Sequence, residues 1–142
     1  MKKVINIYQL PIESDFIFRD LDYVEHVKPM EEVFKDYYLV YTSTEEMPEK
    51  ISTMAFLDLL FTKYNTNRPS DYRGHSLSVS DIIEYDGFFY YINSFGFKKL
   101  NFNRKTVGDV LNEAYKQYMD EGNLIENVWM GYTKLDRFLK VI

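Results

Sequence analysis

Four residues near the middle of the chain have the side chains of a nucleophilic hydrolase: Asp71, His75, Ser76 and Asp81. In such enzymes a histidine takes the proton from a serine hydroxyl, while a carboxylate orients the imidazole ring. One hypothesis is therefore a hydrolase or nuclease centred on these residues. Sequence proximity does not supply the sharp turn, the base within about 3 Å of the nucleophile or the oxyanion hole that this chemistry requires. A structural role is the better supported interpretation, and we assign no catalytic residue from the sequence.

Metal and cofactor chemistry find little support in the sequence. The chain has no cysteine, and its only imidazoles are those of His26 and His75, so a metal site would rest mainly on carboxylates. Those carboxylates lack the spacing of a calcium-binding EF-hand loop. Neither the P-loop of nucleotide-binding proteins nor the glycine fingerprint of dinucleotide-binding folds occurs. The sequence therefore predicts neither a metal site nor a cofactor.

The composition predicts one globular domain that spans residues 1–142. Hydrophobic residues make up 46% and charged residues 27% of the 142 residues, which is close to the average for globular proteins. A chain of this length can bury enough surface to form a proper core. It contains no signal peptide, no apolar run that could span a membrane and no cysteine, so we expect a cytoplasmic protein that does not insert into membranes.

Charge and aromatic content indicate the kind of partner. Lys and Arg number 17 against 22 Asp and Glu, and the formal charge of −5 works against binding to the phosphates of nucleic acids. Aromatic residues reach 18%, and thirteen of them are tyrosines. Tyrosine brings a large contact area and a hydroxyl suited to a wet boundary, so this composition favours a binding surface as well as a core. We expect a protein partner, with homo-oligomerisation as an open alternative.

The pattern along the chain predicts an α+β fold in which two main helices, about 53–64 and 106–121, pack on a small, mostly antiparallel sheet. Apolar residues at helical spacing predict that the first helix is largely buried. Thr106 as N-cap and Gly122 as stop signal bound the second, whose apolar residues share one side. β-Branched and aromatic runs predict strands, and polar or proline-containing runs predict connections. These runs predict strands at 4–10, 37–42, 128–133 and 138–142, a helical turn at 30–35, loops at 43–50 and 65–71, an irregular strand-like segment at 15–27 and a bulge at Gly96.

The stretch 73–100 is the most informative part of the chain, and it predicts antiparallel strands around a hairpin. Side chains alternate between two faces over 76–85, which predicts a strand. Asp81 falls on the otherwise apolar face, so either a bulge turns its carboxylate outward or hydrogen bonds and charge satisfy it in the interior. Asp86-Gly87 predicts a two-residue hairpin turn. The returning strand, 88–92, has bulky side chains on both faces, which predicts that the sheet is covered on both sides.

This stretch, with the residues just before it, resembles the YodL-like domain. That family carries a pattern of the form P-x-D-F/Y-x-G-H/R-S-L/M-S-V-S/G-D-V/I-V/I, followed after a turn by an S-F/Y-G motif. The pattern matches residues 69–83 of this chain, and the later motif matches Ser94-Phe95-Gly96. Two upstream runs, at 7–10 and 39–42, are similar to the opening strands of the family. The resemblance covers about residues 4–100 and leaves 101–142 as a C-terminal extension.

The resemblance implies a biological setting more than an activity. Family members are common in plasmids, conjugative elements and prophages of Firmicutes, and no agreed enzymatic activity goes with the domain. The first hypothesis is accordingly a non-catalytic protein-binding effector from a mobile element or phage, with an inhibitor of a host protein or defence system, of the anti-CRISPR or anti-restriction type, as its specific form. The alternatives are the hydrolase or nuclease described above and a structural accessory protein that acts as an oligomer. The residues that we expect to carry binding are Tyr72, Arg73, His75, Asp81, Asn93 and Phe95.

Overall fold

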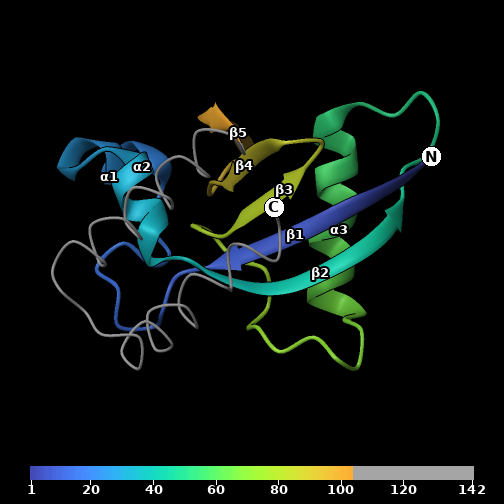
Figure 1. Cartoon of the computed structure of the whole chain (residues 1–142), viewed down its shortest axis with the longest axis horizontal. Coiled ribbons are helices and arrows are strands. Elements are labelled where there is room, and N and C mark those ends of the chain that lie inside the picture. The colour runs from blue at the N-terminus through green and yellow to red at the C-terminus, as the bar shows by residue number, and fades with distance from the viewer. Residues whose placement is uncertain (104–142) are drawn as a thin grey trace, which may run out of the picture.

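The computed structural model describes residues 1–103, which form a five-stranded antiparallel sheet with helices on both of its faces (Figure 1). The strands lie in the order β2-β1-β3-β4-β5, and every neighbouring pair is antiparallel. This architecture confirms the predicted α+β class. The elements are β1 Lys2–Gln9, α1 Leu21–Val27, α2 Met30–Val33, the 3-10 helix η1 Phe34–Asp36, β2 Tyr38–Glu46, α3 Thr53–Thr66, β3 Ile82–Tyr85, β4 Phe88–Ile92 and β5 Phe97–Asn103.

The central strand β1 divides its side chains between two buried clusters. Ile5 and Ile7 pack with α3 on one face of the sheet, whereas Tyr8 packs with α1, α2 and η1 on the other. The side chains of β4 alternate in the same way, because Phe89 joins the second cluster and Tyr90 the first. Both faces of the sheet are therefore buried, as the bulky residues of 88–92 predict.

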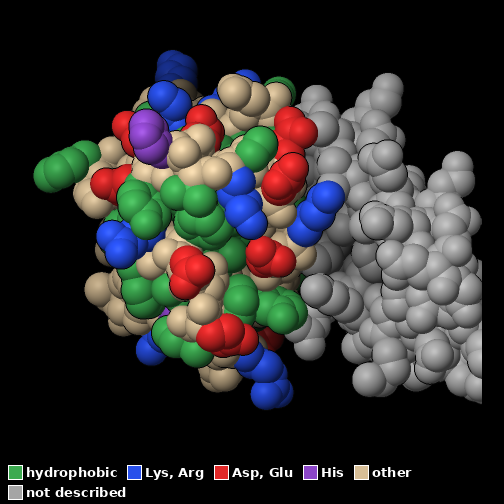
Figure 2. All heavy atoms as spheres, turned by 90° about the vertical axis from the view of Figure 1, so that its left-hand side faces the viewer, with side chains coloured by type: hydrophobic (Ala, Val, Ile, Leu, Met, Phe, Trp, Pro, Cys, Tyr) green, Lys and Arg blue, Asp and Glu red, His purple; other side chains and the backbone are tan. Residues whose placement is uncertain are grey.

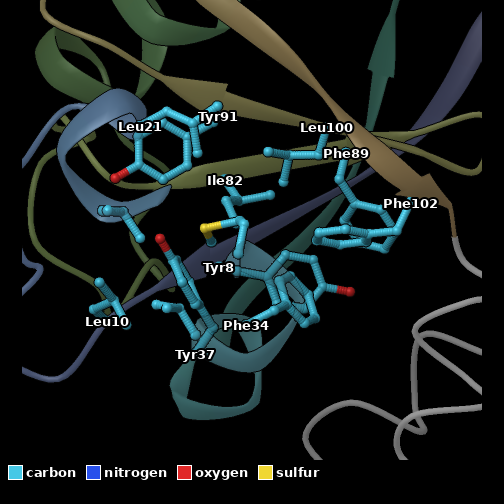
Figure 3. Close-up of a cluster of buried hydrophobic side chains, with 13 residues drawn as sticks. Tyr8, Leu10, Leu21, Phe34, Tyr37, Ile82, Phe89, Tyr91, Leu100 and Phe102 are labelled. Carbon is cyan, nitrogen blue, oxygen red and sulfur yellow. The ribbon is translucent and has the colours of Figure 1, made fainter. Parts of the chain in front are cut away.

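The cluster beneath α1, α2 and η1 is rich in aromatic side chains. Its centre is Phe34, which is 3% exposed. Figure 3 shows this ring among side chains from several strands, and the centroid distances are 5.2 Å to Tyr8, 5.5 Å to Tyr37, 5.2 Å to Phe89 and 5.6 Å to Phe102. Aromatic pairs at such distances add about 0.5–1.5 kcal/mol each beyond the area that they bury. Phe34 thus fixes the short helical segment onto β1, β4 and β5.

Helix α3 confirms the predicted helix, but the prediction that it is largely buried is wrong. The helix begins after Ser52, whose hydroxyl accepts a hydrogen bond from the N–H of Ala55 at 3.1 Å. Met54 and Leu59 are 45% and 51% exposed. The sheet covers only one side of the helix, so its apolar residues on the other side face solvent. The buried residues are Phe56, Leu57, Leu60 and Tyr64.

Residues 21–27 form helix α1, so the prediction of an irregular strand-like segment is wrong there. The helix has only seven residues and buries two of them, Leu21 and Val24. Its N-terminus is capped by a distant side chain, because the N–H of Leu21 donates to Asn93 Oδ1 at 2.9 Å across 72 residues of sequence. A helix this short, with a cap from elsewhere in the chain, leaves no clear periodic signal in its own sequence.

The remaining predictions on the described residues mostly hold. The first strand and the helical turn at 30–35 are confirmed. Strand β2 continues into the predicted loop at 43–50, because its pairing with β1 extends to Glu46. The hairpin turn is confirmed, with the positive φ angles of 53° at Asp86 and 83° at Gly87 that a type I′ turn requires. The elements predicted at 106–121, 128–133 and 138–142 lie outside the described residues.

Gly96 closes a turn between β4 and β5, and the predicted bulge is wrong. Its φ of 78° is a left-handed conformation, and its carbonyl accepts a hydrogen bond from the N–H of Asn93 at 3.0 Å. Strand β5 begins only at the next residue, Phe97. The glycine therefore reverses the chain, which places the intervening residues Ser94 and Phe95 beyond the end of β4.

Candidate functional site

Residues 76–81 form a loop, although the alternation of side chains over 76–85 predicted a strand. Strand β3 begins at Ile82, not at residue 76. The backbone N–H of Ser78 donates to Asp81 Oδ2 at 2.8 Å, and that of His75 donates to Gln9 Oε1 at 3.2 Å. These N–H groups bind side chains instead of a neighbouring strand, which is why the alternating pattern does not produce a strand here.

Gln9, at the end of β1, is the centre of this loop's hydrogen bonds. Its side-chain Nε2 lies 2.9 Å from the carbonyl of His75, 3.0 Å from Asp81 Oδ2 and 3.2 Å from the hydroxyl of Tyr72. The side chain is buried, with 3% exposure. Sequence reasoning did not single out Gln9. The available signal was a polar residue at the end of an apolar strand, which takes on meaning only when its distant partners are known.

Asp81 is buried completely and is satisfied through one of its two oxygens. Oδ2 accepts hydrogen bonds from Gln9 and from the N–H of Ser78. Burial raises the pKa of Asp81 well above its usual value, although these two hydrogen bonds act in the opposite direction. Oδ1 faces His75 Nε2 at 3.9 Å, and neither atom has a hydrogen-bond partner within residues 1–103. Of the two predicted outcomes for Asp81, the structure shows the interior one.

The four hydrolase candidates do not converge on a common point. Nδ1 of His75 lies 2.7 Å from the carbonyl of Ser76, and Nε2 faces Asp81. Both ring nitrogens are thus directed into the protein. No hydrogen bond joins the hydroxyl of Ser76 to His75 in the described part of the chain. The carboxylate of Asp71 instead accepts a hydrogen bond from the Tyr41 hydroxyl at 2.7 Å, which raises the pKa of Tyr41.

Ser80 connects the loop to three other segments. Its N–H donates to the carbonyl of Ile92 at 2.9 Å, its hydroxyl accepts from the N–H of Phe18 at 3.0 Å, and its carbonyl accepts from the hydroxyl of Tyr37. The residue has a φ of 83°, a region that favours glycine. These contacts hold the strained backbone in place.

The turn between β4 and β5 is held by hydrogen bonds to the residue before α1. The N–H of Ser94 donates to Asp20 Oδ1 at 2.6 Å, and the Ser94 hydroxyl lies 2.9 and 3.0 Å from the two oxygens of the same carboxylate. The hydroxyl of Tyr91 also donates to the carbonyl of Arg19 at 2.6 Å. Phe95, at the tip of this turn, is 96% exposed. An almost fully exposed aromatic ring thus stands on a firmly held backbone.

Other exposed aromatic side chains lie close in the chain to the residues that hold this turn. Phe18 is 52% exposed, and its ring lies 5.8 Å from that of His75. Tyr23 is 46% exposed, with the guanidinium of Arg19 4.7 Å from its ring centroid. Figure 2 views the side of the molecule that carries α1 and α2, and it shows hydrophobic side chains interspersed with acidic and basic ones. We call Phe18, Tyr23 and Phe95 the aromatic surface.

The predicted binding residues divide into internal and exposed groups. Asn93 and Asp81 serve internal hydrogen bonds, and the hydroxyl of Tyr72 donates to the carbonyl of His75 at 2.9 Å. His75 is about one-third exposed, while Arg73 and Phe95 are exposed. Sequence reasoning missed the residues that hold these groups in place: Gln9, Phe18, Asp20, Ser78, Ser80 and Ser94.

Replacing Gly74 by alanine is expected to lower the free energy of unfolding by about 2 kcal/mol. A Cβ at this position would lie 2.5 Å from Gln9 Oε1 and 3.1 Å from the hydroxyl of Tyr72, so the alanine would displace the Gln9 side chain. Urea denaturation measures the change. At Gly87 nothing lies within 4 Å of a Cβ, so Gly87→Ala measures only the cost of its φ of 83°, a backbone strain that Gly74 does not share. In a Gln9→Ala background, where the obstructing side chain is absent, Gly74→Ala is expected to cost much less, and an equal cost in both backgrounds would contradict the steric explanation.

Comparison with known proteins identifies one family. The family model of the YodL-like domain matches residues 4–102, which include all the residues of the loop and of the turn described above. No curated protein and no solved structure matches the chain significantly. Within residues 1–103 no group of three His, Asp or Glu side chains is placed to bind a metal ion. None of the helices in the same range has the length and apolar character needed to cross a membrane.

Proposed function

The chain belongs to the YodL-like domain family, and from this premise we propose that it works as a non-catalytic protein-binding module. The specific form that we propose is an effector from a mobile element that inhibits a host protein, such as a component of a defence system. Family membership brings no reaction with it, so the proposal depends on what the described residues offer to a partner.

The observation that carries the proposal is the exposure of Phe95. A phenylalanine side chain that is 96% exposed contributes nothing to the core, yet its turn is fixed by hydrogen bonds between Ser94 and Asp20. Because the turn is already fixed before binding, less conformational entropy is lost when a partner binds. Aromatic side chains that become buried on complex formation are among the residues that contribute most to the binding free energy of protein interfaces. Phe95 has the properties of such an anchor.

The arrangement of the polar residues supports a non-catalytic role. A general base must reach the proton that it abstracts, and a nucleophile must lie within hydrogen-bonding distance of its base. His75 directs Nδ1 to the carbonyl of Ser76 and Nε2 towards the buried Asp81. These polar groups hold the loop against Gln9. This structural role accounts for their positions without a catalytic reaction.

The variant Phe95→Ala is expected to bind its partner at least about tenfold more weakly than the unmodified protein. Immobilised protein is incubated with a lysate of a Firmicute host, and mass spectrometry identifies the retained proteins. A partner purified from that experiment is then titrated by isothermal calorimetry. The free energy of unfolding is expected to change by less than about 0.5 kcal/mol, because the ring makes no contact in the core.

The matched control is Met54→Ala on α3. Met54 is a similarly apolar residue with 45% exposure, and its helix packs on the opposite face of the sheet from α1 (Figure 1). The control is expected to bind like the unmodified protein. A partner retained equally by all three proteins would contradict a role for Phe95. Cleavage of RNA, DNA or ester substrates by the purified protein, abolished by His75→Ala, would contradict the non-catalytic proposal itself.

A further inference from the structure

The net charge of the chain is concentrated in one segment. Residues 11–36 contain eight acidic and three basic residues, a net charge of −5. The other residues contain fourteen acidic and fourteen basic residues, so their net charge is zero. The whole formal charge of −5 therefore belongs to the segment that contains α1, α2 and η1. We call the exposed side of this segment the acidic face.

The acidic face is continuous with the aromatic surface. Both Phe18 and Tyr23 lie within residues 11–36, and Asp20 in the same segment holds the turn that carries Phe95. Ile12 and Val27 add apolar area, with 73% and 56% exposure. In Figure 2 acidic side chains lie next to the hydrophobic ones on this side of the molecule, with basic side chains among them. A partner that covers Phe95 would therefore also meet the acidic side chains.

A hollow of about 270 Å³ lies within the acidic face, between the loop after β1 and the start of β2. Three exposed carboxylates line it, those of Glu13, Asp15 and Asp36, together with the ring of Phe16. None of the three carboxylates forms an ion pair with a residue of the described range 1–103. Lys28 also lines the hollow, and its ammonium lies 5.8 Å from the Phe16 centroid, within the range of a cation–π contact.

The negative charge of the acidic face distinguishes between three classes of partner: nucleic acid, a second copy of this chain and a basic protein. Phosphate-rich nucleic acids would be repelled by a face with a net charge of −5. A second copy bound through the same face would oppose like charges, and a two-fold interface of this kind brings the same surface patch together twice. A protein surface rich in arginine and lysine complements the face and is attracted to it over a distance of about 10 Å at moderate salt.

We propose that the partner presents an arginine- and lysine-rich protein surface with an apolar pocket. The pocket receives Phe95, and a cationic side chain of the partner enters the hollow beside Asp15 and Asp36. This inference rests on the proposed function, because it specifies the chemistry of the partner at the same surface. It assigns separate roles to the two parts of the surface: the aromatic anchor holds the complex together, and the acidic face selects and attracts a basic protein.

The test compares two double charge reversals with equal change in net charge. Asp15→Lys with Asp36→Lys alters the hollow, whereas Glu49→Lys with Asp58→Lys alters exposed residues near and on α3. With the purified partner, the first pair is expected to raise the dissociation constant at least about tenfold at about 50 mM NaCl, and much less at about 500 mM. The second pair is expected to leave the dissociation constant within about twofold.

A defined probe tests the same surface without the natural partner. Isotope-labelled protein is titrated with a hexa-arginine peptide, and amide chemical shifts are followed by nuclear magnetic resonance. The largest changes are expected among residues 11–38. Changes spread evenly over all acidic residues, or equal effects of the two double reversals on partner binding, would overturn the inference. If binding then still depends on Phe95, the proposed function stands while its basic partner is rejected; if Phe95→Ala also binds normally, both fail.

Discussion

Replacing Asp81 by alanine is expected to lower the free energy of unfolding by about 3 kcal/mol. The carboxylate is buried, and it accepts hydrogen bonds from the N–H of Ser78 and from Gln9 Nε2. Alanine leaves the N–H of Ser78 without this acceptor and deprives Gln9 of one of its contacts. A buried donor without an acceptor costs about 1–3 kcal/mol. Urea denaturation of the two proteins at neutral pH measures the difference.

Asp81→Asn is the control that separates hydrogen bonding from charge. The asparagine Oδ1 can accept the same two hydrogen bonds, and its Nδ2 can donate towards His75 Nε2, which lies 3.9 Å from the present Oδ1. The variant is therefore expected to retain most of the stability that alanine loses. Equal losses for the two substitutions would show that the negative charge, not the hydrogen-bond acceptor, holds the loop.

The same pair of proteins predicts a dependence of stability on pH. Burial raises the pKa of Asp81 well above its usual value of 3.8, so the folded protein holds the proton more tightly than the unfolded chain. In the interval between these two pKa values the folded state binds more protons, and its stability falls as pH rises. Asp81→Asn lacks this contribution. The unfolding free energy of the asparagine variant minus that of the unmodified protein is therefore expected to grow as pH rises through that interval. A constant difference would contradict the raised pKa.

Local sequence patterns predicted β1, the β3–β4 hairpin and the position of α3, but not the separate strand β5. Strand β1, the hairpin at Asp86-Gly87 and helix α3 each depend on residues that are neighbours in the chain, through β-propensity, turn conformation and helical spacing. The prediction failed for α1 and for residues 76–81. In the first place the N–H of Leu21 binds the distant Asn93, and in the second the carboxylate that binds the N–H of Ser78 is itself held by Gln9, 72 residues away. Such partners are invisible to any local pattern.

The candidate site likewise combines features that are visible in the sequence with features that depend on distant partners. The sequence drew attention to Asp81 because a carboxylate on an apolar face violates the strand pattern, and the structure buries it where it accepts hydrogen bonds from Gln9 and from the N–H of Ser78. Phe95 was selected through the family resemblance, but its 96% exposure depends on a turn fixed by Asp20. The concentration of charge in residues 11–36 was present in the sequence throughout. It gained meaning only when the fold placed that segment beside the aromatic surface.

Replacing Phe34 by alanine is expected to lower the free energy of unfolding by about 4 kcal/mol, the largest effect of any substitution considered. The side chain is 3% exposed, and its ring contacts those of Tyr8, Tyr37, Phe89 and Phe102. Its removal leaves a cavity among rigid rings that cannot close around it, and it takes away the aromatic contacts as well. Denaturant unfolding measures the loss, and Phe34→Leu, which fills most of the space, is expected to lose less than half as much.

Phe95→Ala is the matched control for Phe34→Ala, because it makes the same chemical change at an exposed position. The two variants are expected to show opposite behaviour: the first binds poorly and unfolds normally, whereas the second unfolds easily. Phe34 anchors the helical segment whose exposed side is the acidic face, so any weakening of partner binding by Phe34→Ala is expected to track its unfolded fraction as denaturant is raised. Weak binding by fully folded Phe34→Ala would instead show that the cluster sets the shape of the acidic face directly.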